Sequence, residues 1–226
     1  MSVFAVGRRF RRVVRFHGAR AGVHMLALAA ARKAVDLERV TFYELARRPE
    51  CEARDRETRW ATAAEIVEMS ADPVWDMRLD ANEVNRLFAA GHRCVLNVVA
   101  GRIAGYAWMN PNRIVVPKLR LAMPVDERRA HIYKGLTHPD FRGQRICVDR
   151  FAHWYAHLTE PRGVTMIVDF SFDNYATLAR AARCGLRPIG HGTYVGRGPA
   201  ERCWVTGPLA RLDREVIPRD LAHCDH

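Results

Sequence analysis

The stretch Thr137–Ile146 contains the residues of this chain best suited to binding an anion. Its residue order predicts the end of a strand, a proline-bearing turn, a loop around Gly143, and a helix that begins near Ile146. The first amide groups of a helix have no intrahelical acceptor, and the helix dipole adds partial positive charge there. Arg142 and Arg145 place two cations in the same loop. Together these features predict a site for a phosphorylated ligand.

The same stretch resembles motif A of the GNAT superfamily of acyl-CoA-dependent N-acyltransferases. The matching residues are His138, Pro139, Phe141, Arg142 and Gly143. A second block, from Asn174 to Gly185, is similar to the N-x-A-x-x-L…G-F helix of that family and has the usual spacing. The resemblance extends from about Thr58 to Val205.

The resemblance implies an α/β (α+β) fold with a mixed, mostly antiparallel central sheet, a splayed pair of parallel strands and helices on both faces. The parallel strands are expected at His131–Leu136 and Val164–Phe172. The predicted organisation is a basic N-terminal extension of a helix plus a strand over residues 1–57, an acyltransferase domain over 58–207, and a C-terminal tail over 208–226.

Local patterns predict further elements. Arg93–Val99 and Arg102–Met109 flank a turn and are typical of a hairpin. Ala81–Ala90 is expected to be a helix, because Asp80 and Glu83 have the spacing of a capping box. The remaining predicted elements are strands at Val40–Leu45, Ile114–Lys118, Leu186–Val195 and Arg202–Thr206, helices at Thr62–Met69, Val148–Leu158 and Asn174–Arg183, and an exposed linker at Arg47–Arg59.

The ligand implied by the resemblance is acetyl-CoA or another acyl-CoA, acting as a co-substrate. Its pantetheine arm would contact the backbone near Leu136 and Thr137, and its diphosphate would lie over the loop that follows. The residues expected to bind it are Leu136, Thr137, Arg142, Gly143, Gln144, Arg145, Ile146, Cys147 and Asn174. Two of them depart from the family pattern, because Arg145 and Cys147 occupy positions where glycine is usual.

The expected acid and base of the family are absent from their usual places. Ala181 stands where a tyrosine is frequent, and the carboxylate position of the strand before the loop falls on Tyr133 or Lys134. Acyl transfer needs a neutral amine and a proton donor for the leaving thiolate. The substitutes predicted for these roles are Tyr133, Lys134 and Asp169. No metal site is expected, because the C-terminal run His223-Cys224-Asp225-His226 lacks a distant fourth ligand.

The composition gives the chain a strong positive charge. The net charge of +11 and the pI near 10.0 favour contact with anions, among which are coenzyme A, an acidic membrane surface and nucleic acid. A cluster of arginines between Arg8 and Arg15 precedes an alanine-rich helical stretch, Ala19–Val35. That stretch either packs on the domain or lies on an anionic membrane. Specific nucleic-acid binding is not expected, since no zinc-finger spacing or RNA-reading motif is present.

The six cysteines form no C-x-x-C pair, which favours a reducing compartment and a cytoplasmic protein, with peripheral membrane contact left open. The sequence therefore predicts an N-acyltransferase that acts on an unidentified amine acceptor. One alternative is a catalytically inactive GNAT-like module that binds acyl-CoA. The other is a basic protein associated with a membrane surface or with nucleic acid. Oligomeric state is not indicated.

Overall fold

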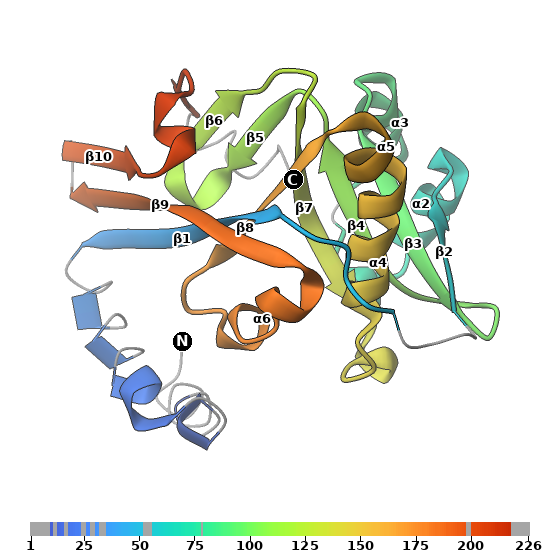
Figure 1. Ribbon diagram of the computed structural model, residues 1–226, viewed down its shortest axis with the longest axis horizontal. Helices are drawn as coiled ribbons and strands as arrows, with labels where there is room; N and C mark the ends of the chain where they lie inside the picture. Colours follow the sequence, from blue (N-terminus) through green and yellow to red (C-terminus); the bar gives the residue numbers. More distant parts are fainter. Residues whose placement is uncertain are drawn as a thin grey trace.

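The computed structural model describes residues 35–51, 56–77, 79–197 and 200–217, together with short stretches between residues 10 and 31. An 8-stranded sheet in the order β10-β9-β1-β8-β7-β4-β3-β2 crosses the whole molecule (Figure 1). Its strands are β1 (Asp36–Leu45), β2 (Arg56–Trp60), β3 (Arg93–Val99), β4 (Arg102–Asn110), β7 (Arg129–Thr137), β8 (Thr165–Ser171), β9 (Leu186–Arg197) and β10 (Ala200–Val205).

Strands β7 and β8 are the parallel pair of this sheet, and the other neighbouring strands pair antiparallel. Parallel pairing begins at Arg129 with Thr165 and ends at Ile132 with Val168. Beyond that point the two strands separate, although β7 continues to Thr137 and β8 to Ser171. The predicted fold class, a mixed and mostly antiparallel sheet with a splayed parallel pair, is confirmed.

A β-bulge bends β7 where it leaves β8. Trp108 of β4 lies opposite Tyr133, whereas Tyr106 lies opposite Leu136, so Lys134 and Gly135 together oppose a single residue of β4. Lys134 adopts a left-handed backbone with φ of 46°. An extra residue of this kind bends a strand and increases its local twist.

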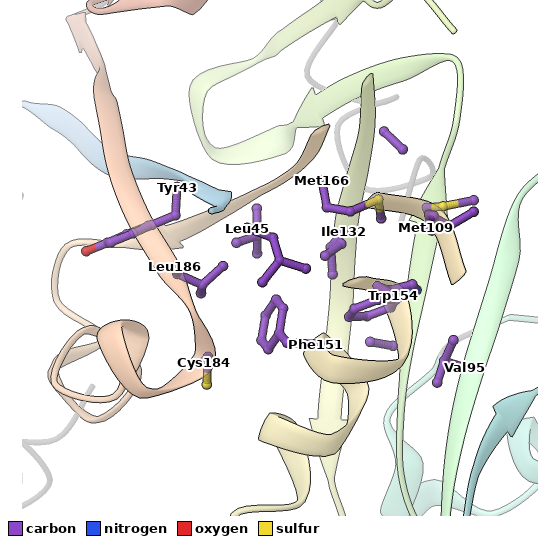
Figure 2. Close-up of a cluster of buried hydrophobic side chains, with 14 of the residues drawn as sticks. Tyr43, Leu45, Val95, Met109, Ile132, Phe151, Trp154, Met166, Cys184 and Leu186 are labelled. Carbon is purple, nitrogen blue, oxygen red and sulfur yellow. The ribbon is translucent and has the colours of Figure 1, made fainter. Parts of the chain in front are cut away.

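One face of the sheet is covered by α4 (Ile146–Trp154), the π-helical turn η4 (Tyr155–Thr159) and α5 (Glu160–Arg162). Phe151 and Trp154 of α4 pack into a buried cluster with side chains from β3, β4, β7, β8 and β9 (Figure 2). Two shorter elements, α6 (Tyr175–Leu178) and η5 (Ala181–Cys184), follow β8 on this face. The helices α4 and α6 and the turn η5 therefore lie on one face of the sheet, next to the place where β7 and β8 separate.

The opposite face is covered by two helices and a small sheet. The helices α2 (Ala63–Ser70) and α3 (Ala81–Ala89), with the turn η1 (Pro73–Trp75), pack on β3 and β4. Both helices begin with a complete capping box, as predicted for Asp80 and Glu83. A 3-stranded sheet in the order β11-β6-β5 covers β1 and β8. Its strands are β5 (Arg113–Val116), β6 (Leu121–Pro124) and β11 (Glu215–Val216). Two short 3-10 helices accompany them, η2 (Pro117–Leu119) and η6 (Pro208–Arg211).

Several predicted boundaries differ from the structure. The helix expected over Asn174–Arg183 is wrong as one element, because α6 ends at Leu178 and η5 begins at Ala181. The linker expected over Arg47–Arg59 contains the start of β2. The strand β1, assigned in advance to an N-terminal extension, lies between β8 and β9 inside the large sheet. Most of the arginine cluster between Arg8 and Arg15, much of the helix expected at 19–35, and the tail after residue 217 lie outside the described residues.

Candidate active site

A cavity of about 1220 Å³ opens where β7 and β8 separate. Pockets for drug-sized molecules usually measure about 300–1,000 Å³, so this one can hold a long ligand. It collects residues from both strands, from the loop before α4, from α6 and η5, and from the small sheet. The predicted site residues that line it are Tyr133, Lys134, Leu136, Thr137, Arg142, Cys147, Asp169 and Asn174.

Four predicted binding residues lie outside the cavity lining. Gly143, Gln144 and Arg145 are exposed in the loop, and Ile146 is buried against Ala104 and Phe141. Their backbone amides and the exposed side chains of Gln144 and Arg145 border the cavity without forming its wall. The exposed position of Arg145 means that its side chain is not part of the cavity wall.

The helix α4 begins at Ile146, as the sequence predicted. Arg145 precedes it with φ of 62°, a left-handed conformation in which glycine is favoured. Within the described chain, no side chain caps this end of α4. Its first amide groups therefore remain available to an anion in the way that helix N-termini generally offer. Arg142 stands beside them and donates through Nε to the carbonyl of Thr137 at 3.3 Å.

A buried arginine that was not predicted as a site residue belongs to the same helix. Arg150 is 5% exposed and lines the cavity. It donates to Asn97 Oδ1 at 2.8 Å, to the carbonyl of Leu136 at 3.2 Å and to Thr137 Oγ1 at 3.3 Å. No carboxylate within the described residues forms an ion pair with it, and burial lowers the pKa of its guanidinium. The cavity thus has a cationic wall next to the loop before α4.

The neighbouring glycine makes this arrangement possible. A Cβ atom on Gly105 would lie 2.3 Å from Arg150 Nη1 and 2.8 Å from the Leu136 carbonyl oxygen. Only a residue without a side chain leaves room for the guanidinium to cross β4 and reach Asn97. The sequence signal was an arginine on the otherwise apolar face of the predicted helix.

On β7, a buried histidine contacts Asp169, the residue predicted as the base. His131 Nε2 lies 2.9 Å from Asp169 Oδ1, and the backbone N–H of Val115 donates to His131 Nδ1 at 3.3 Å. Because Nδ1 accepts, the proton of the neutral ring belongs on Nε2 and is donated to the carboxylate. His131 is 1% exposed, whereas the Asp169 side chain is 20% exposed and lines the cavity. His131 was not predicted as a site residue.

The two residues directly after the last parallel pair face the opening from opposite strands. Asp169 follows Val168 on β8, and Tyr133 follows Ile132 on β7. The Tyr133 hydroxyl lies 2.7 Å from His92 Nδ1, and its ring stacks on His131 with centroids 6.1 Å apart. A carboxylate and a phenol therefore flank the point where the strands separate.

The other predicted side chains have more constrained surroundings. Lys134 lines the cavity and donates from Nζ to the carbonyl of Met77. Asn174 precedes α6, and its carbonyl accepts from the amides of Thr177 and Leu178. Ala181, at the position where a tyrosine is frequent in GNAT sequences, lines the cavity and is 4% exposed.

No protein-family model matches the chain, and no curated protein matches it. Solved structures similar to the chain include a protein from Novosphingobium aromaticivorans described as a GNAT-family acetyltransferase. The two sequences are 14% identical, and the TM-score is 0.49. The match covers 70% of this chain and 62% of that chain.

Two further similar structures are a GNAT-family acetyltransferase from Colwellia psychrerythraea, with 12% identity and a TM-score of 0.48, and a GCN5-related N-acetyltransferase-like protein from Streptococcus suis, with 11% identity and a TM-score of 0.48. Each match covers 74% of this chain, and 59% and 65% of the other chains respectively. The chain therefore spans less than two thirds of these structures. The neighbours are GNAT acetyltransferases at low identity.

Among the described helices, none combines the length and the apolar character needed to cross a bilayer.

Proposed function

We propose that this chain transfers an acyl group from acyl-CoA to an amine acceptor. The observation that carries the proposal is the cavity at the strand opening, which joins the loop before α4 to the Tyr133–Asp169 pair. A ligand with a diphosphate at one end and a thioester at the other would match this order of groups. The motif resemblance in the loop supports the same class of co-substrate.

The charges along the cavity support the orientation. Arg142 and Arg150 lie by Leu136 and Thr137 at the loop end, where the phosphates of acyl-CoA would bind. Asp169 lies at the other end, where an incoming ammonium group must lose a proton. The acceptor is expected to be an amine for this reason, and its identity is left open.

The proposed steps use the two residues at the opening. Asp169, held by the Nε2–H of His131, accepts the proton of the amine. The neutral amine nitrogen attacks the thioester carbon, and the C–S bond breaks to release the thiolate of coenzyme A. The thiolate takes a proton from the Tyr133 hydroxyl, and the second proton that the nitrogen loses on becoming an amide returns to the Tyr133 phenolate. Lys134 is an alternative donor in this role. Proximity alone contributes about 7–11 kcal/mol in favourable cases, so a modest acid and base suffice.

Ligand-induced stabilisation tests the binding half of this proposal. Acetyl-, propionyl- or long-chain acyl-CoA at 100 times its Kd should add about 2.7 kcal/mol to the free energy of unfolding. Arg142→Glu should weaken this effect without unfolding the protein, because Arg142 is exposed. The absence of stabilisation by every acyl-CoA would refute the proposal.

Thiol release across a panel of amines tests the transfer half. Asp169→Asn should lower kcat by about 10²–10⁴-fold, the usual contribution of a general base, while acyl-CoA still stabilises the variant. Tyr133→Phe should lower kcat and leave binding intact. Stabilisation of the wild-type protein without thiol release on any amine would instead favour the inactive binding module, a reading that the alanine at position 181 also favours.

A further inference from the structure

Two cysteines that are far apart in the sequence meet in the cavity wall. Cys147 is the second residue of α4, and Cys184 is the last residue of η5. Their Sγ atoms are 4.0 Å apart, and both residues line the cavity. Cys184 is 4% exposed and lies at the edge of the buried cluster, beside Leu186 (Figure 2). Cys147 is half-buried and therefore accessible from the cavity.

The surroundings favour a thiolate on Cys147. A hydrogen bond from the Cys184 thiol lowers the pKa of Cys147 to about 6; burial opposes this shift and the Arg150 guanidinium adds to it. The same hydrogen bond, with burial, raises the pKa of Cys184. Cys147 also lies in the first turn of a helix, a position that stabilises thiolates.

The other described cysteines have the opposite tendency. Burial and the Asp149 carboxylate raise the pKa of the exposed Cys51 to about 11. Burial also raises the pKa of Cys94 and of Cys203. At neutral pH these three thiols stay protonated and react slowly with oxidants, since the thiolate is the nucleophile. This contrast favours Cys147 as the thiol that reacts first.

We propose that Cys147 and Cys184 form an oxidative modification site that reacts with a hydroperoxide, and that the resulting disulfide narrows the cavity at the start of α4. A disulfide brings its sulfurs to about 2.05 Å, so the two side chains must rotate, or α4 and η5 must approach each other, to close the 4.0 Å separation. Both elements are walls of the cavity. The first half of the proposal is independent of the activity; the second half rests on the proposed binding of acyl-CoA.

The reaction balances with hydrogen peroxide as the oxidant. The Cys147 thiolate attacks one peroxide oxygen, the O–O bond breaks, and the products are a sulfenic acid and, after protonation, water. The Cys184 sulfur then attacks the Cys147 sulfur, and the sulfenic oxygen leaves with a proton as a second water. Two thiols are oxidised to one disulfide and one peroxide is reduced to two waters.

Peptide mapping of the full chain after limited peroxide treatment tests the first half. We expect loss of two hydrogens in the intact mass and one linked pair of peptides, containing Cys147 and Cys184. Cys184→Ser should stop at the sulfenic acid, which dimedone traps on Cys147, and Cys184→Ala provides a second variant if serine impairs folding. Cys51→Ser, the matched control at an exposed thiol, should oxidise as the wild type does. Oxidation of Cys51 or Cys203 at the same rate as Cys147, or no linked pair, would overturn the proposal.

Thermal stabilisation by acetyl-CoA tests the second half on reduced and oxidised protein. Stabilisation should be lost or reduced severalfold on oxidation, and dithiothreitol should restore it. Equal stabilisation of both forms would overturn the link to the cavity. If acetyl-CoA stabilises neither form while the linked pair is found, the acyl-CoA proposal fails and the modification site stands.

Discussion

Arg145 offers a test of the loop geometry that needs no ligand. Its φ of 62° places an L-residue in the left-handed region at the N-cap of α4. That conformation costs a residue with a Cβ about 1–2 kcal/mol. Glycine removes this cost but loses about 0.5–1 kcal/mol through its greater freedom in the unfolded chain. Arg145→Gly should therefore be more stable than Arg145→Ala by about 0.5–1 kcal/mol, the difference of these two terms.

The comparison between the two variants isolates the backbone, because both lose the arginine side chain and its interactions. Urea unfolding at equal m-values measures the difference, and a shift of about 2–4 °C in Tm per kcal/mol is expected for a chain of this size. An alanine variant as stable as the glycine variant, or more stable, would show that residue 145 does not hold a positive φ. The assignment of the loop as a glycine-like phosphate turn would then fail with it.

Two further predictions concern the packing around the site. His153 is half-buried against Trp60, and burial, followed by the His157 charge, lowers the pKa of His153 from 6.5 to about 4. Because the unfolded chain binds this proton more readily, the contribution of His153 to the free energy of unfolding should be complete above pH 6.5 and decline as pH falls toward 4. His153→Phe should flatten that part of a curve of unfolding free energy against pH. Gly105→Ala should lower the free energy of unfolding by about 1–3 kcal/mol, because the added methyl group overpacks against Arg150 and a backbone carbonyl. Gly135→Ala, whose Cβ would meet Ala107 at 3.2 Å, should lower it by less in the same urea assay. An equal loss of stability in the two variants would contradict this account.

The features that the sequence predicted well are those with local causes. The capping box at Asp80 and Glu83 requires contacts only three residues apart, and the structure contains both of its hydrogen bonds. The start of α4 at Ile146 follows from the loop around Gly143, whose φ is 87°. The two parallel strands, placed by the family resemblance, begin and end within about two residues of the predicted bounds.

Alanine, leucine and arginine favour one continuous helix over 174–183, and the sequence of this segment does not indicate the break between α6 and η5. The end of η5, in contrast, has non-local contacts. In the folded chain, the amides of Ala46 and Arg47 both donate to the Gly185 carbonyl, and the Arg47 side chain donates to the Ala182 carbonyl. A Cβ on Gly185 would lie 2.1 Å from the Arg47 carbonyl oxygen. Docking against the end of β1 therefore sets where η5 ends, and β1 lies about 140 residues earlier in the chain.

The site residues that sequence reasoning missed depend on strand register. Nothing in the sequence places Val115 next to His131, because their contact requires the small sheet to fold over β7 and β8. Arg150 requires Gly105 on a neighbouring strand and Asn97 on the strand beyond it. A shift of one residue in either register would turn these side chains to the other face of the sheet. Candidate residues on a single segment could be named in advance, whereas their partners could not.

The opening between β7 and β8 itself follows from competition between neighbouring strands. After Ile132, the bulge at Lys134 keeps β7 paired with β4, since Leu136 still lies opposite Tyr106. After Val168, β8 stays paired with β1, and Asp169 lies opposite Phe42. Each strand thus retains its outer neighbour and loses its inner one. The Asp169 carboxylate and the Tyr133 phenol line the cavity at that position. Both strands keep their backbone pairing with their outer neighbours, so the opening between them is part of the regular hydrogen bonding of the sheet.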